Sequence, residues 1–237
     1  GISSLVSAQT EVIYHKGCNI ISTIKSQEEN EDQGWILDED ASIAEAALIA
    51  GNADAAIVVV GTNLSIANEG EDRVELDLPG KQLELIKKVQ AVNPKTIVVL
   101  INAMPLTINW VDDHVPAILE AWYPGQSGGL ALAEVLFGKT NPGGKLPVTF
   151  YKSTNNLPPL SDYDITKGRS YWFFEGEVLF PFGHGLSYTS FEYSNLKISN
   201  SSPANNDVIK VSFDIYNAGL VSGDEVIQLY IRDLKST

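Results

Sequence analysis

The sequence predicts an α/β protein with a doubly wound, mostly parallel sheet, followed by part of an antiparallel β-sandwich. Up to Tyr151, short β-branched runs alternate with segments of helical periodicity, which is typical of a parallel sheet with helices on both faces. From Phe191 onward, apolar and polar residues alternate with a period of two, as in antiparallel strands. We therefore expect two domains, residues 1–190 and residues 191–237. The second would be incomplete, because its three expected strands cannot close a sandwich.

The expected elements follow the chain in order. Gly51 suits a helix C-terminal cap, Pro79 suits a first helical turn, and Pro147 restricts its strand to a sheet edge. Helical segments are predicted over residues 2–8, 41–51, 79–94 and 127–138. Strands are predicted over 11–15, 55–60, 96–101, 117–123 and 144–151, and then over 192–198, 208–216 and 225–231.

Charge and composition exclude several classes of partner. The net charge of −14 argues against nucleic acid and anionic membranes, which require basic patches, and it is compatible with a neutral ligand such as a sugar. No apolar run reaches membrane-spanning length.

The one cysteine, Cys18, excludes an internal disulfide and a cysteine-based zinc site, and His184 has no second histidine at ligand spacing. The glycine-rich Gly125–Gly129 is interpreted as a tight strand-to-helix turn instead of a phosphate cradle. We expect neither a metal nor a cofactor.

The densest polar cluster follows the strand expected over residues 55–60. Asn68–Arg73 places three acids and one arginine within six residues. A loop at the carboxyl end of a parallel strand is where open α/β sheets place their chemistry. Judged by composition alone, a solvated acidic loop is the more common origin of such a run.

Five stretches, taken in order, carry a family resemblance. They are IVVVGTNLSIANEGEDRVELDLPGKQLELI, VVLINAMPL, ILEAWYPGQSGGLALAEVLFGKTNPGGKLPVTF, GRSYWFFEGEVLFPFGHGLSYTSFEYSNL and GDEVIQLYI. From Glu11 to its end, the chain resembles the C-terminal half of glycoside hydrolase family 3, the β-glucosidase and β-xylosidase family. The resemblance implies a (β/α)8 barrel, a six-stranded flavodoxin-like α/β sandwich and a fibronectin type III-like domain. It also implies that the barrel and the first sandwich strand would precede Gly1, and that the parent enzyme is periplasmic or extracellular.

The resemblance also implies the site residues. The family's acid/base is a glutamate in an EGxDR-type loop, which corresponds here to Glu69, and Glu71 is the weaker rival. Retaining hydrolysis uses two carboxyl groups about 5–5.5 Å apart. Asp72 and Arg73 are interpreted as support for the loop, with Arg73 orienting neighbouring carboxylates. The family's nucleophilic aspartate lies on the barrel, and no segment of this chain matches its surroundings.

The expected function is that of a fragment of a retaining exo-β-glycosidase acting on oligosaccharides or glycosides with terminal β-linked glucose or xylose. It carries the acid/base but not the nucleophile, so the fragment alone should be inactive. The motif SIANEGEDR…LPGKQ slightly favours a β-xylosidase over a β-glucosidase. The alternative is a non-catalytic carbohydrate-binding or scaffolding module of the same fold. A flavodoxin-like nucleotide binder is disfavoured, because Gly61-Thr62-Asn63 is not a glycine-rich phosphate loop.

The aromatic run Lys167–Phe173 suits sugar stacking or domain packing, and its length favours packing.

Overall fold

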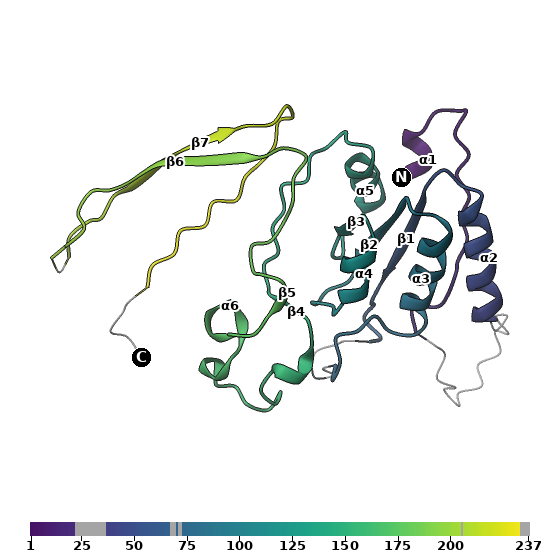
Figure 1. Ribbon diagram of the computed structural model, residues 1–237, viewed down its shortest axis with the longest axis horizontal. Helices are drawn as coiled ribbons and strands as arrows, with labels where there is room; N and C mark the ends of the chain where they lie inside the picture. Colours follow the sequence, from purple (N-terminus) through teal and green to yellow (C-terminus); the bar gives the residue numbers. More distant parts are fainter. Residues whose placement is uncertain (22–36, 67–69, 71–72, 205, 233–237) are drawn as a thin grey trace.

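The computed structural model describes residues 1–21, 37–66, 70, 73–204 and 206–232 (Figure 1). Its helices are α1 (Ile2–Leu5), α2 (Glu39–Gly51), α3 (Gln82–Val92), α4 (Asn109–His114), α5 (Gly128–Leu136) and α6 (Ser170–Phe173), with the 3₁₀ turns η1 (Thr154–Asn156) and η2 (Ile165–Lys167). Its strands are β1 (Ala56–Gly61), β2 (Thr96–Ile101), β3 (Ala117–Glu120), β4 (Phe150–Tyr151), β5 (Val178–Phe180), β6 (Phe191–Ile198) and β7 (Val211–Asn217).

Strands β1, β2 and β3 form a parallel sheet in that order, which confirms the predicted α/β class. The central strand β2 is apolar on both faces, and Val98, Val99 and Leu100 are buried, as expected for a parallel strand covered on both sides. Strand β3 ends at Glu120, three residues earlier than predicted. The reason is Trp122, whose φ of 51° takes the chain out of the extended conformation.

The core lies between this sheet and helices α2, α3 and α4. Alternate residues of β1 and β2 point into it, because successive side chains of a strand face opposite sides. Its members are Ile43, Ala50, Val58, Val60, Leu85, Ile86, Val89, Val98, Leu100, Leu106, Ile108, Val111 and Val115. Val59 lies on the other face of β1 and is 56% exposed. Burial is therefore concentrated on the helix-covered face of β1.

Local polar groups set the ends of the helices. Helix α2 begins two residues before its predicted start, because the Asp38 carboxylate caps it by accepting from the Ala41 N–H at 3.1 Å. Helix α3 begins at Gln82 and not at Pro79, because Gly80 (φ 61°) places a turn between them. Asn93 joins the ends of α2 and α3. Its Nδ2 donates to the carbonyls of Ala50 and Ala53 at 2.9 and 3.0 Å.

Three strand predictions are wrong. Residues 11–15 pair with no strand among those described, and Tyr14 is largely exposed. Of residues 144–151, only Phe150–Tyr151 forms a strand, and it pairs antiparallel with β5 outside the parallel sheet. Pro147 cannot donate a ladder hydrogen bond, which agrees with the short strand. Residues 225–231 likewise belong to no strand, while helices α4 and α6 were not predicted.

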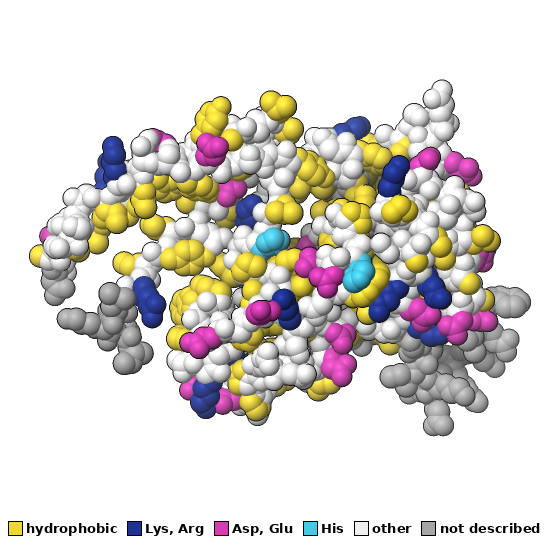
Figure 2. All heavy atoms as spheres, viewed as in Figure 1, with side chains coloured by type: hydrophobic (Ala, Val, Ile, Leu, Met, Phe, Trp, Pro, Cys, Tyr) yellow, Lys and Arg dark blue, Asp and Glu magenta, His cyan; other side chains and the backbone are white. Residues whose placement is uncertain are grey.

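Strands β6 and β7 form an antiparallel ribbon that extends away from the parallel sheet (Figure 1). Hydrophobic side chains gather along it (Figure 2), and Leu196, Ile198 and Tyr216 are more than half exposed. Two antiparallel strands bury too little to be stable alone. The ribbon agrees with the expected antiparallel character of residues 191–237, and the division of the chain at residue 190 stays a prediction.

Candidate functional site at the carboxyl edge of the parallel sheet

The carboxyl ends of the three parallel strands meet at one edge of the sheet. Thr62 follows β1, Asn102 follows β2, and Glu120 ends β3. Thr62 and Asn102 are buried, and Glu120 is partly buried. Open α/β sheets bind their ligands at this edge, because loops from several strands converge there. The edge is therefore the candidate site, and the long polar loop after β1 belongs to it.

Gln82 fastens the two ends of this loop together. Its Oε1 accepts from the Gly61 N–H at 2.6 Å, and its Nε2 donates to the carbonyls of Gly61 at 2.8 Å and Pro79 at 3.1 Å. The side chain is 2% exposed. Gly61 approaches the next strand so closely that an added Cβ would lie 1.9 Å from the Ile101 oxygen. The loop therefore leaves the sheet at a junction that only glycine fits.

Arg73 holds the last part of the loop, residues 73–77, which is called the loop arm below. Its Nη2 donates to the Asp77 carbonyl at 2.6 Å, and its Nη1 lies 3.9 Å from the Met104 sulfur. The Asp77 carboxylate accepts from the Thr107 hydroxyl. These contacts bind the arm to the segment after β2. Burial lowers the pKa of the Arg73 guanidinium, against the opposing effect of the nearby Asp77 carboxylate.

The other predicted loop residues, Glu69, Glu71 and Asp72, lie outside the described residues. Gly70, between the first two, is exposed and has a φ of 80°. The assignment of the acid/base to Glu69, with Asp72 and Arg73 in support, therefore stays a prediction. What the structure adds is the anchorage of the loop on both sides, at Gly61 and at Arg73.

Glu120 is a site residue that the sequence interpretation missed. Its Oε1 accepts from the Trp122 N–H at 3.1 Å, and its Oε2 lies 3.5 Å from Asn102 Nδ2. Burial raises the pKa of the Glu120 carboxyl to about 7, against the lowering effect of these two donors. The Asn102 amide also donates to the Met104 carbonyl at 2.7 Å, so Glu120, Asn102 and Met104 form a chain that ends at Arg73. A carboxylate inside the apolar run AILEAWY was the available signal.

The part of the chain that the structure describes contains no group of three or more His, Cys, Asp or Glu side chains placed to hold a metal ion. Burial raises the pKa of the free Cys18 thiol to about 11, so this thiol is a poor nucleophile. Within the same described residues, no helix has the length and apolar character needed to span a membrane.

The fold and its polar carboxyl edge define the class as an open α/β domain with a parallel sheet. Residues 3–188 match the family model described as "Glycosyl hydrolase family 3 C-terminal domain", and the chain belongs to this family. This confirms the resemblance read from the sequence.

The relatives are glycosidases by name. The chain is 39% identical to a protein of Formosa agariphila named "Beta-xylosidase", over 98% of this chain and 31% of that protein. It is 33% identical to the "Periplasmic beta-glucosidase" of Salmonella typhimurium, over 100% of this chain and 33% of that protein. A solved β-glucosidase from Erythrobacter marinus superposes with a TM-score of 0.73 at 37% identity, covering 89% of this chain and 30% of the other. The chain thus spans about a third of the length of these curated relatives.

Proposed function

We propose that the chain is the acid/base-bearing part of a retaining exo-β-glycosidase that removes terminal β-linked xylose or glucose from oligosaccharides. The observation that carries this proposal is the family match over residues 3–188, together with relatives named β-xylosidase and β-glucosidase. The EGxDR-type loop after β1 supplies the candidate group, Glu69. A parent enzyme in the periplasm or outside the cell agrees with the periplasmic name of the Salmonella relative.

In the proposed mechanism Glu69 acts twice. As an acid it protonates the glycosidic oxygen while the partner carboxylate attacks the anomeric carbon, so that the leaving sugar departs as an alcohol and a glycosyl-enzyme ester forms. As a base it then removes a proton from water, which attacks the anomeric carbon and releases the sugar with its configuration retained. Asp72 and Arg73 keep the loop in shape, and Arg73 does so through the Asp77 carbonyl.

We further propose that the partner carboxylate is an aspartate on a barrel domain of the longer protein. The share of the relatives that this chain covers, about a third, supports this division of roles. Gln82 holds the loop at Gly61, and the Asp77 carbonyl holds it at Arg73. We propose that the residues between these two positions face a neighbouring domain. The chain alone should then hydrolyse neither aryl β-xylosides nor aryl β-glucosides.

The test is replacement of Glu69 by Ala in the longer protein, with Glu71→Ala as the matched control. A dinitrophenyl glycoside needs no protonation, so Glu69→Ala should form the glycosyl-enzyme quickly and show a burst, followed by slow turnover. Loss of general acid–base catalysis should lower turnover about 10²–10⁴-fold. Azide needs no base, so it should restore turnover and give a glycosyl azide of retained configuration.

Rescue of Glu71→Ala and not of Glu69→Ala would move the acid/base by two residues. If Glu69→Ala keeps full activity on a substrate with a poor leaving group, the alternative is favoured, in which this chain is a non-catalytic module of the longer protein. For the unaltered longer protein, the ratio of kcat/KM for an aryl β-xyloside to kcat/KM for an aryl β-glucoside decides whether xylose or glucose is the preferred sugar.

A further inference from the structure

Two hollows lie on the segment that joins β4 to β5, and the turn η1 contributes to both. The larger, of about 440 Å³, is lined by Phe173 and Phe174 together with the polar residues Asn156, Thr166, Lys167 and Glu175. The smaller, of about 320 Å³, is lined by Thr154, Asn155 and residues of the loop arm such as Asp77. Both volumes fall in the range of small-molecule sites. The larger hollow combines two aromatic side chains with four polar ones.

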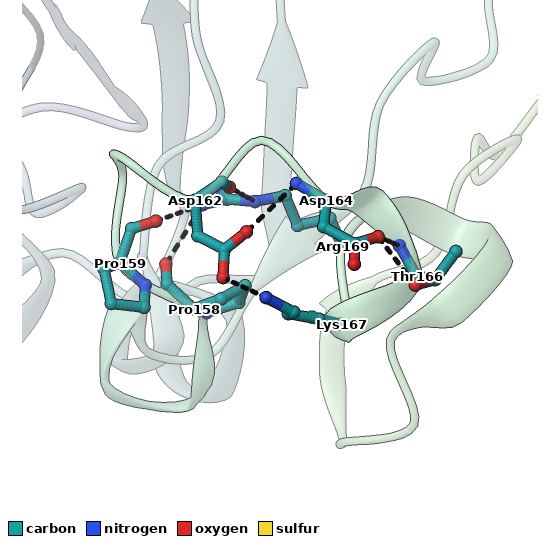
Figure 3. A network of polar contacts seen from close by, with 7 residues as sticks. All are labelled: Pro158, Pro159, Asp162, Asp164, Thr166, Lys167 and Arg169. Carbon is teal, nitrogen blue, oxygen red and sulfur yellow. Dashed lines mark hydrogen bonds and ion pairs between the residues drawn. The ribbon is translucent and has the colours of Figure 1, made fainter.

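One wall of the larger hollow is held in place by a polar network (Figure 3). Arg169 donates from Nη2 to the carbonyls of Pro158 and Pro159 at 3.1 and 2.6 Å, and from Nε to the Asp162 carbonyl at 3.1 Å. Lys167 Nζ lies 2.8 Å from Asp162 Oδ2. One guanidinium thus joins residues that are eleven positions apart in the chain. A wall built before the ligand arrives reduces the ordering cost of binding.

The aromatic side of the hollow is held as well. The Phe174 ring meets the Tyr151 ring edge to face, with centroids 4.9 Å apart. The Tyr151 hydroxyl accepts from the Ser170 N–H at 3.0 Å, which ties the start of α6 to β4. Phe173, beside Phe174, remains 37% exposed. The sequence interpretation favoured domain packing for this run. Tyr171 of the run stacks on Phe182, with centroids 4.3 Å apart, and Phe173 lies in the lining of the hollow.

The charges of the hollow favour a neutral ligand. Lys167 in its lining is paired with Asp162 at 2.8 Å, and Lys152, which lines the smaller hollow, is paired with Glu177 at 2.9 Å. Glu175 adds a negative charge to the lining, in a chain whose net charge is −14. An anion would have to compete with these carboxylates for the two ammonium groups. A sugar, by contrast, offers C–H faces to Phe173 and hydroxyls that both donate to and accept from amide, hydroxyl and carboxylate groups.

We propose that this hollow, rimmed by η1, is a binding site for a neutral oligosaccharide, separate from the hydrolytic chemistry of the Glu69 loop. It would hold a polysaccharide or a long oligosaccharide beside the candidate site, because η1 also borders the smaller hollow at the loop arm. The binding requires no hydrolysis and no other domain.

The experiment is a titration of the 237-residue chain with xylotetraose and with cellotetraose, followed by amide NMR. The backbone amides of Asn156, Lys167, Gly168 and Gly176 should shift with sugar concentration. Loss of a central aromatic contact costs more than about 1 kcal/mol, so Phe173→Ala should weaken binding at least about fivefold. Asn156→Ala, on the exposed η1, should weaken it without disturbing the fold. The matched control Tyr163→Ala removes an exposed aromatic ring that lines neither hollow and should bind as the unaltered chain does.

Absence of saturable shifts at these amides with either sugar would overturn the proposal. Unchanged binding by Asn156→Ala and Phe173→Ala would overturn it too, and if Phe173→Ala fails to fold, Asn156→Ala alone decides. Shifts produced by inorganic phosphate and not by sugar would identify an anion site instead. Because only binding is measured, failure here leaves the Glu69 assignment standing, and failure of the Glu69 test leaves this site standing.

Discussion

Replacing Glu120 by Gln should stabilise the chain at neutral and alkaline pH and change its stability little in acid. Glu120 ends β3 in a partly buried position, where its carboxyl accepts from the Trp122 N–H. Burial disfavours the charged form and raises the pKa of this group from 4.5 to about 7. Glutamine keeps the shape and one acceptor oxygen for the Trp122 N–H, and it removes the buried charge. Its amide nitrogen replaces the oxygen that lies 3.5 Å from Asn102 Nδ2.

The magnitude follows from the two pKa values. Below pH 4.5 the Glu120 carboxyl is protonated in the folded and the unfolded state, so it makes no pH-dependent contribution. Between pH 4.5 and about 7 only the unfolded chain releases the proton, and the free energy of unfolding falls by about 1.4 kcal/mol per pH unit. Above pH 7 the loss is complete, at about 3 kcal/mol. Glu120→Gln should recover most of this amount, reduced by the cost of placing an amide nitrogen beside the Asn102 Nδ2 donor.

The assay is urea unfolding of both proteins at intervals from pH 4 to pH 8.5, with the difference in unfolding free energy plotted against pH. Taking the difference cancels the other titrating groups. Glu192→Gln, which removes an exposed carboxylate on β6, is the matched control. A difference for Glu120→Gln that does not change with pH would refute the reasoning. So would a variant that is less stable at pH 8 than the unaltered chain.

Three further substitutions test the framework of the site by urea unfolding. Gln82→Ala should cost about 2–3 kcal/mol, because it leaves the buried N–H and carbonyl of Gly61 without the partners they have now. Gly61→Ala should cost at least about 3 kcal/mol, since its Cβ would overlap the Ile101 oxygen at a φ of 150°. Phe150→Ala should cost about 3–5 kcal/mol, because the ring is 1% exposed and lies against Trp122 and Phe180.

Gln90→Ala is the matched control for Gln82→Ala. Gln90 lies on the same helix, is only partly buried, and donates from Nε2 to the His114 carbonyl at 3.1 Å. Its removal should cost less than about 1 kcal/mol. Equal losses for the two glutamines would contradict the role given to Gln82 at the loop junction.

The sequence by itself determined the parallel α/β class and the family. The β-branched runs at residues 55–60 and 96–101 became β1 and β2 within one residue of the predicted bounds, because buried parallel strands need apolar side chains on both faces. Helix α2 followed from its alanine-rich periodicity. The polar loop after β1 was recognised from its charge density, and Glu69 was chosen within it by family resemblance.

Only the tertiary structure decided which distant residues support that loop. Gln82 meets Gly61 across 21 residues, and Asn102 meets Glu120 across 18. Neither pair has a local signature, since a single glutamine on a helix and a single glutamate in a strand fit many environments. The same holds for β4, which pairs with β5 and not with the parallel sheet. Strand pairing and side-chain burial depend on which segments lie side by side, and periodicity within one segment carries no information about that.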